Sequence, residues 1–217
     1  FTNAAWIKSG SSITSNATTA PDGTSTAQKL VESAATSTHF VYTSATTTAT
    51  AYSCSVYVKA AERSWVYVRF SSGAYFNVST GVVGTTDAGV TASISSVGNG
   101  WYRCSIVQTE SAGTNYPTVF LASVNGTNSY TGDGVSGIYI WGAQLEQSST
   151  ANTYAATTAA ASGAPRFDYD PVALTPKGLL IEETRTNVCL QSAALATSPW
   201  AATSCTIANA STASPRS

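Results

Sequence analysis

Apolar and polar residues alternate with a period of two along most of the chain up to residue 146. Because successive side chains of a β-strand point to opposite faces of its sheet, this alternation predicts half-buried strands. Turn-forming residues separate the alternating stretches, for example Gly-Asn-Gly at 98–100 and Asn-Gly at 125–126. The strands predicted in this way are residues 38–43, 50–60, 64–71, 74–79, 89–96, 100–109, 117–124 and 137–146.

The number of short strands predicts the fold class. No segment keeps a helical period for long, and a parallel sheet would need helical crossovers between its strands. We therefore predict an all-β protein, an antiparallel β-sandwich. The sandwich is expected over residues 1–150. Residues 151–164 are rich in Ala, Thr and Ser and have little to bury, so we expect them to form a linker. Ordered structure is expected to resume within 165–217.

The end of the chain is similar to its beginning. Residues 195–200 match residues 1–6, and Pro215 matches Pro21 at the same spacing. Two interpretations stay open, an internal repeat or a coincidence of Ala, Ser and Thr composition. On the repeat interpretation, residues 165–217 are a connector and the incomplete start of a second unit. The chain contains no Met, so we expect it to be a piece of a longer protein.

The repeat interpretation has a consequence for the sheet edges. Residues 179–192 would form the first strand of the second unit, and the equivalent strand of the first unit would precede Phe1. An edge of the sandwich would then lack a neighbour. We expect the C-terminal segment either to pair with that edge, in the same or another chain, or to be poorly ordered.

Composition excludes several kinds of partner. Charged residues make up 10% of the chain and the net charge is -1, so the basic surface of a nucleic-acid-binding protein is missing. No apolar run approaches the roughly 18 residues that a membrane span needs. We expect neither nucleic acid nor a membrane as partner. The abundant Ser, Thr, Asn and Gly are common in extracellular and virion-surface β proteins.

The four Cys residues show no metal-binding spacing. Alternation places Cys54 and Cys104 on the apolar faces of their strands, so both are expected to be buried. They are either two separate core thiols, as buried Cys residues usually are, or a bridged pair. Cys189 and Cys205 lie in the C-terminal segment.

Candidate catalytic groups are sparse. His39 is the only histidine, and a lone strand His without a placed carboxylate does not make a catalytic triad. Glycoside hydrolysis needs two carboxylates about 5 to 9.5 Å apart across a cleft. The Asp and Glu residues of the predicted sandwich are scattered, mostly in turns, with no close pair on one strand face. We therefore expect no enzyme, and a concanavalin-like glycosidase is the least favoured alternative.

One predicted strand carries a polar-aromatic face. Alternation over 64–71 places Trp65, Tyr67 and Arg69 opposite an aliphatic side that is expected to face the core. Neighbours on that face are about 7 Å apart, which is comparable to the spacing of sugar rings in a polysaccharide. Flat aromatic rings stack on the apolar faces of sugars, while guanidinium and amide groups bind their hydroxyls. This strand is therefore a candidate glycan-binding surface.

The same alternation extends the candidate surface to two other strands. Tyr57 and Lys59 face away from the apolar side of one strand, and Trp101 and Arg103 from that of another. If the three strands share a sheet, they form one polar-aromatic face. The alternative is that loops or the N-terminal segment cover this face, with the tryptophans simply packing beneath them.

Six short motifs in the chain point together to one family. They are residues 16–27 (NATTAPDGTSTA), 57–60 (YVKA), 98–104 (GNGWYRC), 141–146 (WGAQLE), 166–170 (RFDYD) and 178–187 (GLLIEETRTN). The first four resemble the jelly-roll modules of tailed-phage tail fibres and other virion proteins, which are related to carbohydrate-binding modules of families four and nine. The last two resemble the connector that precedes such modules in phage proteins.

The resemblance implies a fold, a location and a partner. It implies a jelly-roll sandwich in a phage tail or another virion protein, or in an extracellular one, that binds a polysaccharide or cell-surface glycan without catalysis. The alternative is a structural virion domain that contacts other virion chains and has no glycan ligand. Modules of this kind often hold a structural Ca²⁺, for which Asp22, Asp133 and Glu146 are the candidate ligands.

Overall fold

The computed structural model describes residues 1–156, 167–169 and 176–179. The chain divides into two compact units, residues 1–158 and 159–217. The described part of the second unit is one antiparallel hairpin of β17 (Phe167–Tyr169) and β18 (Pro176–Leu179). The segments matched as a repeat, 195–200 and Pro215, lie outside the described residues. Most of the strand expected over 179–192 does so too.

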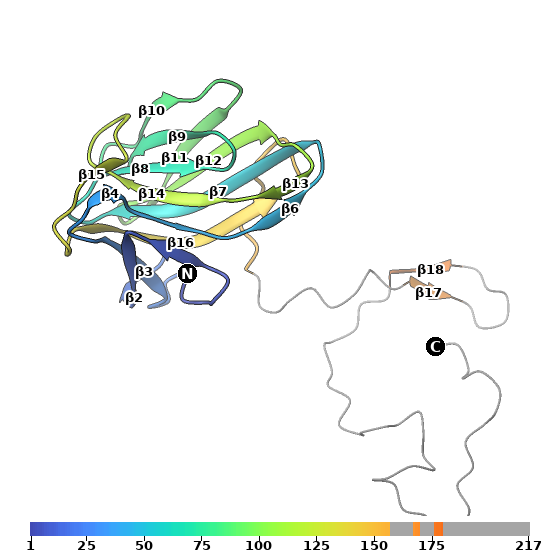
Figure 1. The fold of residues 1–217 in the computed structure, drawn as a ribbon. Coiled ribbons are helices and arrows are strands. Elements are labelled where there is room, and N and C mark those ends of the chain that lie inside the picture. The colour runs from blue at the N-terminus through green and yellow to red at the C-terminus, as the bar shows by residue number, and fades with distance from the viewer. Residues whose placement is uncertain (157–166, 170–175, 180–217) are drawn as a thin grey trace, which may run out of the picture. The chain divides into compact units, whose positions relative to one another are not determined.

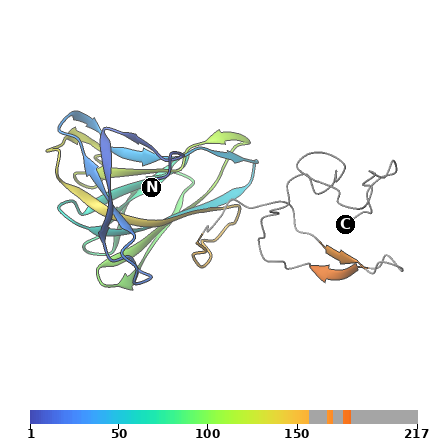
Figure 2. The same ribbon diagram turned by 90° about the horizontal axis from the view of Figure 1, so that it is seen from below.

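The first unit is a β-sandwich of two antiparallel six-stranded sheets that pack face to face (Figures 1 and 2). In spatial order, sheet A consists of β1 (Ile7–Ser9), β5 (Phe40–Tyr42), β14 (Thr118–Ala122), β8 (Trp65–Arg69), β9 (Gly73–Asn77) and β10 (Val82–Thr86). In spatial order, sheet B consists of β11 (Thr91–Gly98), β12 (Trp101–Thr109), β7 (Ala51–Ala60), β16 (Gly137–Glu146), β3 (Ala27–Glu32) and β2 (Ser11–Thr18). Two short pairs lie beside the sheets: β6 (Ala45–Thr47) with β13 (Gly113–Asn115), and β4 (Thr36–Thr38) with β15 (Ser129–Thr131).

The all-β class predicted from the sequence is confirmed, and each of the eight predicted strands overlaps an observed one. The strands that the pattern did not predict are mostly three residues long or lie at a sheet edge. β2 is an example, because its sequence SSITSNAT is polar and its residues are exposed or half-buried. Such strands are held by pairing with a neighbour rather than by an apolar face of their own, so they leave little periodic signal.

The core is the apolar layer between the two sheets. It is built largely from β-branched residues at alternate positions, such as Val56 and Val58 in sheet B and Val66 and Val68 in sheet A. Each of these side chains is at most 1% exposed, and burying one stabilises the fold by about 1.5 to 3 kcal/mol. The other side chain of each alternating pair points away from this layer, onto an outer face.

Cys54 and Cys104 are both buried and both free, which confirms two separate core thiols. In the register of β7 and β12, Cys104 lies opposite Val56 and Cys54 opposite Ile106. Burial raises the pKa of the Cys54 thiol to about 12 and that of Cys104 still further, so both stay protonated at neutral pH.

A buried ion pair joins the β7–β8 connection to sheet B. Glu32 is 1% exposed, and its two carboxylate oxygens accept hydrogen bonds from Nε and Nη2 of Arg63. The hydroxyl of Tyr130 and the backbone N–H of Asp133 donate to the same carboxylate. Burial by itself would raise the pKa of Glu32, but these four hydrogen bonds outweigh burial and hold it below its ordinary value.

We expect Arg63→Met to lower the free energy of unfolding, measured with urea, by about 3 kcal/mol at neutral pH, because a buried carboxylate is left without its cation.

The stabilisation that ionised Glu32 contributes is complete above its ordinary pKa, near 4.5, and is lost as the pH falls through the lowered folded value. Urea unfolding of the wild type and of Glu32→Gln should therefore differ at neutral pH and converge under acid conditions. A difference that does not change with pH would contradict this account.

Candidate functional site

The outer face of sheet A is lined with aromatic side chains in cross-strand rows. Trp65, Tyr67 and Arg69 of β8 all lie on this face, as alternation predicts, because Val66 and Val68 point into the core. In the register of the sheet, Tyr67 lies between Tyr75 of β9 and Phe120 of β14. Arg69 lies opposite Thr118 of β14, which in turn lies opposite Tyr42 of β5.

Six rings on and beside this face form a continuous chain, which we call the aromatic ladder. Each ring lies 4.4 to 5.8 Å from the next, measured between ring centroids. Such offset contacts add about 0.5 to 1.5 kcal/mol per pair beyond the burial of area, so they hold the rings in place. In order, the ladder is Tyr75, Tyr67, Phe120, Phe40, Tyr42 and Tyr116.

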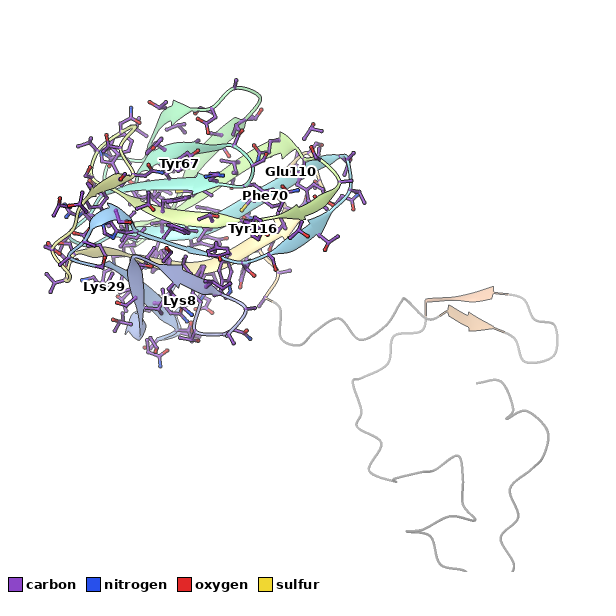
Figure 3. The ribbon with its side chains drawn as sticks, viewed as in Figure 1. Lys8, Lys29, Tyr67, Phe70, Glu110 and Tyr116 are labelled. Atoms are coloured by element: carbon purple, nitrogen blue, oxygen red, sulfur yellow. The ribbon has the colours of Figure 1, made fainter. Side chains whose placement is uncertain are left out.

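One end of the ladder is open. Tyr116 is 51% exposed, Tyr42 is half-buried, and the two rings meet edge to face at 5.8 Å. Tyr116 lies away from Tyr67, which belongs to the other half of the ladder (Figure 3). A groove of about 710 Å³ runs along this open end. Its lining residues are Ile7, Lys8, Ser9, Phe40, Tyr42, Arg69, Phe70, Ser71, Asn115, Tyr116, Thr118 and Phe120.

The groove offers both hydrogen-bond donors and acceptors. Arg69 is exposed, and within the described residues its guanidinium forms no ion pair or hydrogen bond. The Asn115 amide lies deeper, where its nitrogen donates to the Thr47 hydroxyl at 2.7 Å. Lys8 donates to the carbonyl of Trp6 at 2.7 Å. The groove therefore combines exposed rings with a free guanidinium and an amide whose oxygen has no hydrogen-bond partner among the described residues.

The other end of the ladder is closed. Tyr67 is only 8% exposed, and its hydroxyl donates to Oδ2 of Asp87 at 2.6 Å. The same oxygen accepts the backbone N–H of Gly73 at 2.8 Å, which pins the segment after β10 to sheet A. Burial, and then the Asp87 carboxylate, raise the pKa of Tyr67 above its ordinary range. Tyr67 therefore supports the ladder from below and does not present a free face, contrary to the prediction.

Trp65 lies at the closed end too. Its side chain is half-buried, and a Cβ added at Gly84 would approach its ring to 2.7 Å. The side chain of Asn125 closes the same spot and accepts the backbone N–H of Thr85 at 2.8 Å. Trp65 is thus partly covered by β10 and the turn at 124–127. Of the three residues predicted on β8, only Arg69 lines the groove.

The three candidate strands do not share a sheet, so the condition for one joint polar-aromatic face is not met. β8 belongs to sheet A, whereas β7 and β12 belong to sheet B, so their outer faces point in opposite directions from the core. Trp101 is 1% exposed, and its indole N–H donates to the carbonyl of Thr19 at 3.1 Å. It packs against Ala20 and Ala27, so the loop before β3 covers it. For Trp101, the covered alternative is the observed one.

The other predicted residues of β7 and β12 share the outer face of sheet B. Tyr57 lies opposite Arg103, and its ring contacts those of Trp141 and Tyr154 at 5.3 and 5.8 Å. Lys59 lies opposite Trp101 in the same register and is half-buried. These side chains line neither the groove nor the ladder.

The sandwich extends past residue 150, where composition places the start of a linker. Gln144 binds the following segment twice: its amide donates to the carbonyl of Thr153, and its side-chain oxygen accepts the backbone N–H of Ala155 at 2.8 Å. Tyr154 lies 4.8 Å from the ring of Trp141. Residues 148–155, which we call the strap, therefore lie against sheet B rather than away from it.

The three candidate calcium ligands do not come together. Asp22 accepts hydrogen bonds from Thr24, Asp133 caps the backbone N–H groups of Val135 and Ser136, and Glu146 binds Asn152. Among the described residues no three acidic, His or Cys side chains cluster in a way that could hold an ion. Asp22, Asp133 and Glu146 therefore do not fit one shared Ca²⁺ site.

His39 is enclosed in the protein. It is fully buried, with Nδ1 2.6 Å from the carbonyl oxygen of Gly10 and Nε2 3.2 Å from that of Tyr130. Its ring also packs on the Tyr130 ring at 4.9 Å. These contacts tie β1, β5 and β15 together, which is a structural use of the imidazole.

Sequence reasoning missed the aromatic residues that form the open groove. The signal for three of them was present, since Phe40 and Tyr42 flank Val41, and Phe120 lies between Val119 and Leu121. The same alternation that was applied to β8 places all three on the outer face. Tyr116 precedes β14 and follows no period, so only the folded chain shows where it lies.

We expect Asp87→Ala to lower the free energy of unfolding by about 2 kcal/mol, because it leaves the buried Tyr67 hydroxyl and the Gly73 N–H without an acceptor. Tyr67→Phe removes one donor and keeps the ring, so it should cost about 1 kcal/mol. In a double-mutant cycle followed by urea unfolding, the two changes should couple by about 1 kcal/mol. If the two changes in unfolding free energy simply add, the hydrogen bond between Tyr67 and Asp87 does not stabilise the closed end of the ladder.

Comparison with known proteins does not identify a family for the chain. No protein-family model matches the chain, and no curated protein does. The described residues form strands, turns and loops, and they include no helix that could cross a membrane. The groove at the open end of the aromatic ladder is thus the candidate site on its geometry alone.

Proposed function

We propose that the chain is a non-catalytic carbohydrate-binding module that holds a polysaccharide in the groove on the outer face of sheet A. The observation that carries this proposal is the open end of the aromatic ladder, where exposed Tyr116 and half-buried Tyr42 lie beside the unpaired Arg69. Rings fixed by their neighbours bind a flat apolar surface with little loss of conformational entropy. The hydroxyl and guanidinium groups around them can bind sugar hydroxyls.

The shape of the groove suits a chain-like ligand. It is open along the sheet rather than a closed cavity, and it runs from Arg69 of β8 across β14 and β5 to Ile7 of β1. Neighbouring strands lie roughly 4.8 Å apart, so the three intervals between these four strands span about 14 Å. This is the length of two to three sugar rings. A polysaccharide lying across the strands would contact Arg69 near one end and Tyr42 near the other.

The lining of the groove favours binding without catalysis. None of its lining residues is an Asp or a Glu, whereas glycoside hydrolysis uses two carboxylates that flank the bond. Two acidic groups of this sheet and its connections are engaged in hydrogen bonds: Asp87 accepts the Tyr67 hydroxyl, and buried Glu110, close to Phe70 in Figure 3, accepts from Ser71 and Gln108. We therefore propose a binding module and not an enzyme.

The strand order supports a jelly roll. Four central strands of sheet B, β3-β16-β7-β12, face four of sheet A, β5-β14-β8-β9, and the chain passes repeatedly from one sheet to the other. We infer from this order the two nested Greek keys of a jelly roll. Together with the resemblance in sequence, this favours a phage tail or another virion protein as the source of the module, or an extracellular protein.

We expect Tyr116→Ala and Tyr42→Ala each to weaken polysaccharide binding about tenfold, because each removes one stacking ring at the open end. Affinity electrophoresis against a panel of soluble polysaccharides, followed by titration with the best one, measures the loss. Tyr139→Ala is the matched control, since Tyr139 lies on the outer face of sheet B and should leave binding unchanged. If the wild type is retarded by no polysaccharide, the proposal is wrong.

A second candidate function is assembly of the virion without a glycan ligand. It is favoured by the apolar rim of the same groove, where Ile7 is 50% and Tyr116 51% exposed. On this reading the groove would bury a segment of another copy of this chain in the virion. Sedimentation of the purified protein with and without the polysaccharide panel separates the two, because assembly predicts association that Tyr116→Ala weakens and that polysaccharide does not change.

A further inference from the structure

Arg103 lies on the outer face of sheet B without an acidic partner. Its guanidinium carbon is 5.6 Å from the centre of the Tyr57 ring, and its Nη2 donates to the Ser55 hydroxyl at 2.9 Å. The two ion pairs of the described residues involve other cations, Lys29 and Arg63. A half-buried guanidinium that is stacked on a ring and bonded to one hydroxyl keeps its positive charge uncompensated.

The hydrogen bonding of this side chain is incomplete as well. A guanidinium carries five N–H donors, and the described part of the chain offers this one a single acceptor. Its Nε is enclosed by protein and has no partner there. Leaving such a buried donor unpaired costs about 1 to 3 kcal/mol, so its persistence calls for an explanation.

A hollow of about 340 Å³ adjoins Arg103, between the outer face of sheet B and the strap. Six of its nine lining residues are Ser or Thr, contributed by β11, β12 and the strap, and none is an Asp or a Glu. Glu146, at the base of the strap, is engaged by Ser53 and Asn152. The lining residues are Thr91, Ser93, Ser95, Arg103, Ser105, Val107, Ser149, Thr150 and Ala151.

We propose that this hollow binds an oxyanion, the carboxylate or sulfate group of an acidic sugar. The guanidinium of Arg103 supplies the charge, Tyr57 fixes its plane, and the Ser and Thr hydroxyls donate to the remaining oxygens of the ligand. As a sugar site it rests on the proposed carbohydrate-binding function, but it lies on the sheet opposite the groove and is therefore tested separately. It gives the module a second contact of different chemistry, which selects for negative charge.

The side-chain Nε–H resonance of Arg103 reports on this site directly, because an enclosed N–H exchanges slowly with solvent. We expect titration of the ¹⁵N-labelled protein with glucuronate or with sulfate to shift this resonance with saturation, and glucose to leave it in place. The two anions separate a carboxylate ligand from a sulfate ligand. Arg63, whose guanidinium is already bonded to Glu32, is the internal control and should show no saturable shift.

Two variants complete the test. Arg103→Gln should reduce the affinity for the active anion tenfold or more, as loss of a charge-assisted contact does. Lys29→Gln, which removes a cation already paired with Glu62, should leave that affinity unchanged. If Arg103→Gln does not fold, Ser93→Val with Ser95→Val fills the hollow at two exposed positions of β11 and should abolish the shift. No shift in the wild type, or an equal shift at Arg63, would overturn the proposal.

Discussion

The apolar layer between the two sheets is the constraint on which the rest of the structure depends. Each strand commits alternate side chains to it, as Val66 and Val68 do in β8, so the intervening residues must lie on an outer face. Residues that bind a ligand can therefore lie only at the outward positions of the strands, in the connections or at the sheet edges. The aromatic ladder of sheet A and the Arg103 hollow of sheet B both arise from this division.

The outer faces differ in what covers them. On sheet A the segment after β10 returns to bind Tyr67 through Asp87, and this closes one end of the ladder while the Tyr116 end stays open. On sheet B the loop before β3 covers Trp101, and the strap covers the end of β16. In a binding module the covered rings also contribute, because they pack against the exposed rings and hold them in a fixed orientation.

Alternation predicts well which face of its own strand a side chain lies on, but it does not predict which strands pair with each other. It correctly separates Trp65, Tyr67 and Arg69 from the core side of β8, because a period of two is a property of one strand. It cannot place β8 and β7 in different sheets, since β8 pairs with β14, which lies far along the chain. The covering of Tyr67 and Trp101 was also out of reach, because the polar loops responsible carry no periodic signal.

Charge is scarce in this chain, so the position of each charge is informative. Only 10% of the residues are charged, so hydroxyl and amide groups rather than charges hydrate most of the surface. Lys29 and Arg63 are neutralised by Glu62 and Glu32. Within the described residues two arginines have no acid, and each lines a hollow on a different outer face, Arg69 on sheet A and Arg103 on sheet B. A half-buried arginine kept unpaired against an aromatic ring, as Arg103 is, is costly for folding alone, which is the physical reason to look for a ligand beside it.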